Sequence, residues 1–199
     1  MRLAVCVSGR GSNLLALMDA LGKSPLAQVV LVLSNRPDAE ALEVARERGI
    51  HAVALTDYRD PFEWLARLSS ERVDLVVLAG YLKLVPAEVI AAYRGRILNI
   101  HPALLPAFGG PGMYGRRLHD AVLRSGAKVS GATVHMVDEE YDRGEILAQA
   151  RVPVLPGDTA ESLAARVLEA EHRLLPAVVL RAAEAGRPVA LPEPLESPA

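Results

Sequence analysis

The chain has 199 residues, a formal net charge of −2 and 51% hydrophobic residues. This length fits one domain with a substantial core, the apolar content argues against extensive disorder, and the nearly balanced charge argues against a general nucleic-acid or anionic-membrane surface. The single cysteine, Cys6, rules out an intramolecular disulfide and fits a reducing compartment. The first apolar run is too short for a signal peptide or a membrane span, so we expect a cytoplasmic protein.

Short apolar runs alternate with helical patterns over the first hundred residues. The apolar runs are continuous, which is typical of parallel strands buried on both faces, and the alternation predicts a doubly wound α/β fold. The predicted strands cover residues 3–8, 29–34, 52–55, 75–79 and 96–100. The predicted helices cover residues 13–21, 39–48, 61–70 and 86–93.

The pattern changes after the glycine-rich segment 109–112. A short helix is predicted at 116–123, followed by two longer strands at 130–137 and 146–154. An acidic loop separates these two strands, and their spacing and polarity predict an antiparallel pair at the C-terminal end of a mostly parallel sheet.

A long C-terminal helix is predicted to begin at Asp158, with Glu161 three residues later in a capping-box pattern. Pro176 should kink or break this helix. We expect a single domain over residues 1–186 and a Pro-rich, loosely held tail over 187–199.

A glycine-rich loop, Ser-Gly-Arg-Gly-Ser-Asn at 8–13, joins the first predicted strand to the first helix. Gly9 and Gly11 permit positive φ and close backbone approach, and Ser12 or Asn13 can cap the helix, whose free N–H groups attract an anion. A dinucleotide fingerprint needs a third glycine and a later acidic residue, and a Walker loop needs Gly-Lys-Ser/Thr; neither pattern is present. The loop therefore predicts a phosphate-monoester site, with a purely structural turn as the alternative.

Asn99 and His101 lie two residues apart at the carboxyl end of a predicted strand, on one face, where α/β sheets bind ligands. An amide can hydrogen-bond an oxyanion and an imidazole can move a proton near neutral pH, so the pair indicates acyl transfer. Asp142 is a candidate partner that would raise the pKa of His101, although the pattern does not distinguish it from the other acids of its loop. His135 fits a site residue and a core histidine equally well.

Glu171 falls on the core-facing stripe of the long helix. A carboxylate there costs several kcal/mol unless it is paired or reaches a ligand, and an ion pair with Arg166 or Arg173 is the alternative to a binding role. No set of residues has zinc-ligand spacing, so no metal is predicted. The tight Leu-Leu-Pro turn predicts a cis bond between Leu105 and Pro106.

Several motifs together resemble the phosphoribosylglycinamide formyltransferases, which are folate-dependent enzymes of purine biosynthesis. The resemblance runs from residue 1 to about residue 180. The Asn-x-His-Pro motif alone indicates only the wider formyltransferase superfamily, and the 8–13 loop and the short chain narrow the assignment to this family within it. The motifs are Ser-Gly-x-Gly-Ser-Asn (8–13), Val-Val-Leu-Ala-Gly-Tyr (76–81), Asn-Ile-His-Pro-x-Leu-Leu-Pro (99–106), Gly-Gly-x-Gly-Met-Tyr-Gly (109–115), Gly-Ala-Thr-Val-His (131–135) and Asp-x-Gly (142–144).

This resemblance implies a formyltransferase fold and transfer of the formyl group of 10-formyltetrahydrofolate, a co-substrate, to the amine of glycinamide ribonucleotide. By the match, Asn99 and His101 would stabilise the oxyanion of a tetrahedral intermediate, and His101 would relay a proton. Asp142 would orient His101 and help take the amine proton through water. A homodimer is also expected, and no nucleic-acid or membrane partner.

The implied binding residues form two sets. Gly11, Ser12 and Asn13 would hold the ribonucleotide phosphate, and Glu171 its ribose or glycinamide end. Arg59 and His135 are further candidates for the site. The implied folate-binding residues are Leu82, Lys83, Leu84, Val85, Asn99, Met136, Val137, Asp138, Glu139, Glu140, Tyr141 and Asp142.

The chain departs from the family pattern at three places. Lys83 stands where a family member carries Arg, Arg143-Gly144 stands where that member has Gly-Gly, and Pro111 stands where Lys is common. An ammonium cannot replace a guanidinium in a bidentate contact, so we expect the contact of Lys83 with the pterin or glutamate part of the folate to differ in geometry.

Three other functions remain as alternatives. A related enzyme would formylate a tRNA or a sugar amine, and the tRNA enzyme should carry an additional C-terminal domain and a basic surface. A formyltetrahydrofolate hydrolase should carry an N-terminal regulatory domain. A non-catalytic phosphoribosyl-binding module would explain the 8–13 loop but not Asn99, His101 and Asp142 together.

Overall fold

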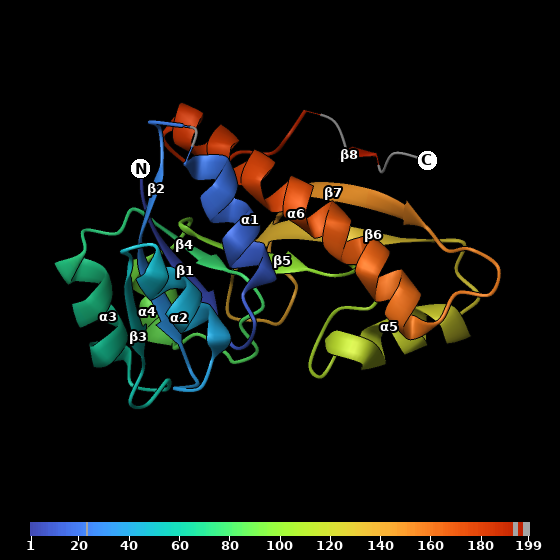
Figure 1. Cartoon of the computed structure of the whole chain (residues 1–199), viewed down its shortest axis with the longest axis horizontal. Helices are drawn as coiled ribbons and strands as arrows, with labels where there is room; N and C mark the ends of the chain where they lie inside the picture. Colours follow the sequence, from blue (N-terminus) through green and yellow to red (C-terminus); the bar gives the residue numbers. More distant parts are fainter. Residues whose placement is uncertain (23, 193–194, 197–199) are drawn as a thin grey trace.

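The computed structural model describes residues 1–22, 24–192 and 195–196, and within them the strands form one eight-stranded sheet. The first five strands are parallel, in the order β3-β2-β1-β4-β5, and β6 and β7 continue the sheet as antiparallel neighbours. Figure 1 labels the elements. The strands are β1 (Arg2–Val7), β2 (Gln28–Ser34), β3 (His51–Ala54), β4 (Leu75–Leu78), β5 (Ile97–His101), β6 (Val129–Met136), β7 (Ile146–Pro153) and β8 (Leu195–Glu196).

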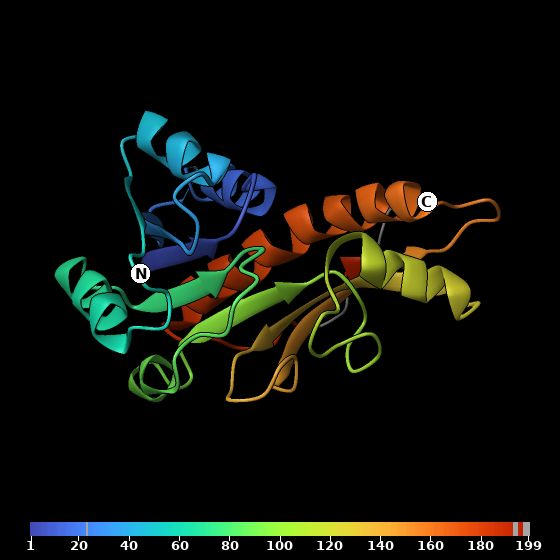
Figure 2. The ribbon, with the colours of Figure 1, turned by 90° about the horizontal axis from the view of Figure 1, so that it is seen from below.

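Helices cover both faces of this sheet, as Figure 2 shows from below. Side chains from α1 (Ser12–Leu21), α2 (Glu40–Glu47), α5 (Gly115–Arg124) and α6 (Ala160–Ala185) share one hydrophobic cluster with one face of the strands. α3 (Pro61–Ser70) and α4 (Ala87–Ala92) contribute to a second cluster on the opposite face.

The central strand β1 shows how the sequence builds both clusters. Its alternate side chains Leu3, Val5 and Val7 enter the first cluster, whereas Ala4 and Cys6 enter the second. All five are completely buried. A strand with apolar residues at every position is therefore stable only between two helical layers, which explains why continuous apolar runs predicted this architecture.

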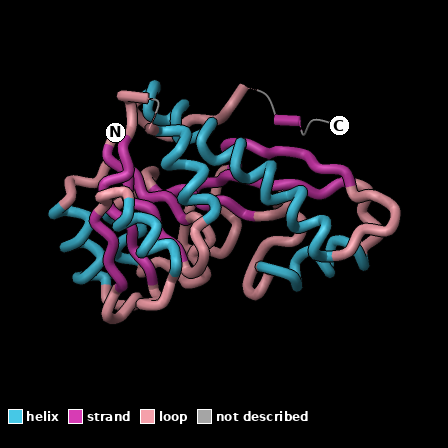
Figure 3. Tube along the Cα trace, viewed as in Figure 1, coloured by secondary structure: helices cyan, strands magenta, loops and turns pink. Residues whose placement is uncertain are grey.

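The predicted fold class is confirmed. The doubly wound, mostly parallel sheet, the antiparallel β6–β7 pair and the long helix α6 are all present, and each predicted element between residues 2 and 154 begins and ends within one residue of the observed one. α6 lies along β6 and β7 on one face (Figure 3). The Leu105–Pro106 bond is cis, as predicted.

The predicted start of α6 is wrong. The helix begins at Ala160, and its cap is Thr159, whose hydroxyl accepts from the Ser162 N–H while Ser162 Oγ accepts from the Thr159 N–H. The Asp158 carboxylate instead binds the guanidinium of Arg166 at 2.9 Å and accepts the Ser162 hydroxyl at 2.8 Å. Arg166 and the Asp158 hydrogen bonds lower the pKa of this carboxyl.

Two other helix predictions also need correction. α6 continues through Pro176 to Ala185, so the alternative of a break at this proline is wrong, whereas a kink there stays a prediction. α1 is preceded by Gly11 in the left-handed conformation (φ 82°), and among the described residues no side chain caps this helix, neither Ser12 nor Asn13. A glycine adopts this conformation without steric cost, which leaves the first N–H groups of α1 free of side-chain partners.

Part of the segment after α6 returns to the sheet. The Leu191 N–H donates to the Leu147 carbonyl, and Leu195–Glu196 pairs in parallel with Ala150 and Arg151 of β7. For residues 193–194 and 197–199, the prediction of a loosely held tail lies outside the described residues. Within the described helices, none is both long and apolar enough to cross a membrane.

Replacing Thr159 with alanine should lower the free energy of unfolding by about 1 kcal/mol, because the Ser162 N–H loses its capping acceptor. Urea denaturation followed by circular dichroism measures this change. Thr159→Ser keeps the hydroxyl and serves as the matched control, with an expected loss of a few tenths of a kcal/mol. Equal midpoints for the two variants would show that the capping box does not stabilise α6.

Candidate active site

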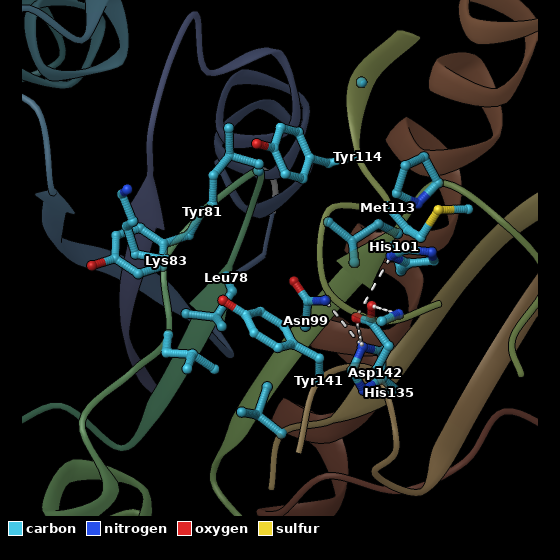
Figure 4. A pocket seen from close by; sticks show the side chains of 18 of the residues that line it. Leu78, Tyr81, Lys83, Asn99, His101, Met113, Tyr114, His135, Tyr141 and Asp142 are labelled. Carbon is cyan, nitrogen blue, oxygen red and sulfur yellow. Dashed lines mark hydrogen bonds and ion pairs between the residues drawn. The ribbon is translucent and has the colours of Figure 1, made fainter. Parts of the chain in front are cut away.

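A cavity of about 440 Å³ opens at the carboxyl ends of β1, β4 and β5. The strand order reverses between β1 and β4, and α/β sheets bind ligands at such a switch point. The cavity is lined by the loop after β1, the segment after β4, the end of β5, the loop before α5, the loop after β6 and one side of α6. Figure 4 shows this lining, with Tyr81 and Lys83 on one side and His101 and Asp142 on the other.

Asn99 and His135 are brought together by strand pairing. They are direct partners in the antiparallel β5–β6 ladder, and Asn99 Nδ2 lies 3.0 Å from His135 Nε2. His135 Nδ1 donates to the Met136 carbonyl at 2.7 Å, so the neutral ring presents its Nε2 lone pair to the amide. The second hydrogen of the Asn99 amide is then available to a ligand.

His101 lies between a carbonyl and a carboxylate. Its Nε2 is 2.9 Å from the Phe108 carbonyl oxygen, and its Nδ1 is 3.6 Å from Asp142 Oδ1. Burial lowers the pKa of His101, and the Asp142 charge and the Phe108 hydrogen bond raise it only in part. The Asp142 carboxylate therefore raises the pKa of His101, as predicted, but the net shift of this pKa is downward because His101 is only 4% exposed.

Asp142 connects the two histidines to the loop before α5. Its Oδ1 lies 3.5 Å from His135 Nε2 and 3.6 Å from His101 Nδ1, and its Oδ2 accepts the Gly110 N–H at 2.8 Å (Figure 4). Burial raises the pKa of Asp142, but its interactions with His135 and His101 and the bond from the Gly110 N–H together hold it below its usual value. Asp142 is thus a carboxylate at neutral pH, between two imidazoles.

The other three acids of this loop have partners of their own. Asp138 accepts the Glu140 N–H at 2.9 Å, Glu139 binds Arg94 at 2.8 Å, and Glu140 lies 3.8 Å from Arg143. Of the four, Asp142 is the one that contacts the histidines.

Glu171 and Asn13 are two buried polar residues that line the same cavity. Burial raises the pKa of Glu171 to about 7, although a hydrogen bond from the Asn13 amide lowers it in part. The Asn13 oxygen has no hydrogen-bond partner among the described residues. Arg166, one of the two predicted alternative partners, binds Asp158 instead, and Glu171 is among the residues that line the cavity.

Not every predicted residue lines this cavity. Of the predicted phosphate residues, Asn13 does, whereas Gly11 and Ser12 lie outside the lining. Arg59 and Glu139 line an adjoining cleft of about 690 Å³, which shares residues 82–85 with the cavity. The lining residues among the folate candidates are Leu82, Lys83, Leu84, Val85, Asn99, Val137, Asp138, Glu140, Tyr141 and Asp142.

Sequence reasoning missed several lining residues. Arg10, from the loop 8–13, and Met113 and Tyr114, from the segment before α5, all line the cavity. His119, from α5, is buried, and its Nδ1 has no hydrogen-bond partner within the described part of the chain. The motif at 109–115 contains Met113 and Tyr114 and could have identified them as site residues. His119 lies in an amphipathic helix, where no pattern distinguishes it from a core residue.

Comparison with known proteins agrees with this fold. A family model described as formyl transferase matches residues 1–179, and the chain belongs to this family. It is 48% identical over 185 residues to the chloroplastic phosphoribosylglycinamide formyltransferase of Vigna unguiculata, with 89% of this chain covered but 59% of the relative. The chain thus spans about three fifths of that relative.

Within the family, two further proteins match over most of their length. The phosphoribosylglycinamide formyltransferase of Escherichia coli (strain K12) is 38% identical over 186 residues, covering 90% of this chain and 85% of that protein. The crystal structure of phosphoribosylglycinamide formyltransferase from Anaplasma phagocytophilum superposes with a TM-score of 0.88 at 35% identity, covering 98% of this chain and 97% of that one.

Replacing Asp142 with asparagine should lower the pKa of His101 further, because the carboxylate that stabilises the imidazolium is removed. Nuclear magnetic resonance titration of the His101 ring measures this pKa. Asp138→Asn removes a charge from the same loop without a contact to His101 and serves as the control. A His101 pKa that rises in Asp142→Asn would contradict the assigned electrostatics.

Proposed function

We propose that this chain transfers the formyl group of 10-formyltetrahydrofolate to the amine of glycinamide ribonucleotide, a step of purine biosynthesis. The observation that carries the proposal is that Asn99, His101 and Asp142 line one cavity together with Asn13 and Glu171. An amide donor can stabilise the oxyanion that forms when an amine attacks a formyl carbon, and an imidazole and a carboxylate can move the protons. The names of the relatives support the same reaction.

The proposed reaction forms one C–N bond and breaks another. The amine lone pair of the ribonucleotide attacks the formyl carbon, and the carbonyl oxygen becomes an oxyanion in a tetrahedral intermediate. The free Asn99 amide hydrogen and a proton on His101 stabilise that oxygen, since donors held in a water-poor site stabilise developing charge strongly. Asp142 takes the amine proton through water, a proton reaches the folate nitrogen, and the bond from that nitrogen to the formyl carbon breaks.

The two substrates are proposed to enter from different sides. The main-chain N–H groups of Gly11, Ser12 and Asn13 bind the ribonucleotide phosphate at the start of α1, and the first turn of that helix carries no acid that would repel it. Glu171 accepts hydrogen bonds from the ribose or glycinamide end. The folate lies between residues 82–85 and the loop 136–142, and Arg59 borders the adjoining cleft. The homodimer and the cytoplasmic location stay predictions.

Purified protein should release tetrahydrofolate from 10-formyltetrahydrofolate only when glycinamide ribonucleotide is present, as followed by absorbance. Asn99→Ala and His101→Ala should each lower kcat by about 100-fold or more, with both substrates still bound, because an oxyanion donor is lost. His51→Ala, an exposed histidine paired with Glu71, is the control and should keep full activity.

Each other outcome points to a different function. Release without the ribonucleotide indicates a hydrolase. Binding of the ribonucleotide without any release indicates a binding module or another acceptor. Full activity in both Asn99→Ala and His101→Ala would exclude the proposed mechanism.

Binding of glycinamide ribonucleotide near pH 7 should release protons from Glu171. Burial raises the pKa of this carboxyl to about 7 in the free protein, so it is partly protonated there. Hydroxyl or amide donors of the ligand favour the carboxylate, lower its pKa and expel the proton. The release should therefore vanish well below and well above pH 7.

Calorimetry in buffers of different ionisation enthalpy measures the number of protons released. Glu171→Gln binds the same ligand without this titration, so the difference between the two proteins isolates the contribution of Glu171. An equal proton count for wild type and Glu171→Gln would show that the ligand does not reach this side chain.

A further inference from the structure

Ser8 is a buried hydroxyl at the junction of three segments. It follows the last residue of β1, opens the loop 8–13 and is 5% exposed. Its Oγ–H donates to Asn35 Oδ1 at 2.6 Å, and its Oγ accepts the Leu82 N–H at 2.9 Å. Because a hydroxyl has one hydrogen, the bond to Asn35 orients the Ser8 lone pairs toward Leu82.

The bond to Leu82 holds a segment that has left the sheet. The last ladder-like contact between β4 and β1 is the Ala79 N–H to the Cys6 carbonyl, at 2.9 Å. Gly80 then turns the chain with a φ of 74°, and residues 80–85 form neither helix nor strand. The Leu82–Ser8 bond ties this segment back to the end of β1.

The loop 8–13 is held from its other side by α2. The Ala41 N–H donates to the Gly9 carbonyl at 3.1 Å, and a Cβ on Gly11 would approach the Ala41 Cβ to 2.5 Å. The loop is therefore packed against α2 on one side and bonded to residue 82 through Ser8 on the other.

We propose that the Ser8 hydroxyl couples the two substrate sites, so that the ribonucleotide and the folate each strengthen the binding of the other. This inference rests on the proposed function, in which residues 11–13 bind the phosphate and residues 82–85 form a wall of the folate site. Ser8 is a positioning residue, because it acts through Leu82 and touches neither reacting group.

The coupling has a conformational origin. A phosphate bound to the N–H groups of residues 11–13 orders the loop, and the Ser8 hydroxyl transmits this order to Leu82. The folate then binds a wall whose main chain is already fixed, so it loses less conformational entropy. Linkage requires the reverse effect to be of equal size.

The test measures ribonucleotide binding with and without tetrahydrofolate, the product that carries no formyl group and therefore permits no turnover. In wild type, saturating tetrahydrofolate should tighten ribonucleotide binding by about 5-fold or more in calorimetry. In Ser8→Ala this ratio should fall toward one. The folate KM of Ser8→Ala should rise about 3- to 10-fold while kcat changes little, because one hydrogen bond to the folate wall is lost and the reacting groups stay in place.

Ser34→Ala is the matched control. Ser34 is a completely buried serine at the end of the neighbouring strand β2, its Oγ accepts the Arg36 N–H at 3.0 Å, and it lines neither the cavity nor the adjoining cleft. This variant should keep the wild-type ratio. Ser8→Cys, which has a similar size but a weak hydrogen-bonding group, gives the same readout if Ser8→Ala does not fold.

The outcomes separate this inference from the proposed function. If wild type binds both ligands and Ser8→Ala keeps the wild-type coupling ratio, the role of Ser8 is wrong and the proposed function stands. If tetrahydrofolate leaves ribonucleotide binding to the wild type unchanged, the two sites are not coupled, and again the proposed function stands. If wild type binds neither ligand, the proposed function fails and this inference fails with it.

Discussion

The antiparallel pairing of β5 with β6 is the interaction on which the site depends. It sets Asn99 opposite His135 and His101 opposite Thr133. The Thr133 hydroxyl in turn donates to the Ala103 carbonyl and accepts the Leu105 N–H, which holds the turn after β5. A slip of one residue would turn every one of these side chains to the other face of the sheet. The register of one strand pair therefore determines which polar groups meet.

The site concentrates charge where water is scarce. Asp142, at 11% side-chain exposure, lies between two imidazoles that are almost fully buried, and burial raises the pKa of Asp142 while it lowers that of His101. Glu171 is buried in the same cavity, and the Asn13 amide lowers its pKa only in part, so this carboxyl keeps its proton up to a pH of about 7. One cavity thus contains a carboxylate that stays charged and a carboxyl that titrates near neutrality, which is the separation that acid–base chemistry uses.

Much of the fold was predictable because its signals are local. Continuous apolar runs predicted strands, amphipathic segments predicted helices, and the Leu-Leu-Pro turn predicted its cis bond. The cap of α6 was not predictable from spacing, because both Asp158 and Thr159 suit the position. Arg166, eight residues further along the chain, binds the Asp158 carboxylate, and Thr159 provides the cap.

For the candidate site, the sequence by itself determined that an amide and an imidazole, Asn99 and His101, lie on one face of a strand, since residues two apart in a strand share a face. It determined that a glycine-rich loop precedes the first helix. The tertiary structure alone decided which of four acids meets the histidines, that His135 faces Asn99, and that Ser8 holds Leu82. These choices depend on strand register and loop closure, which join residues 36 or more positions apart in two of the cases and which no local pattern records.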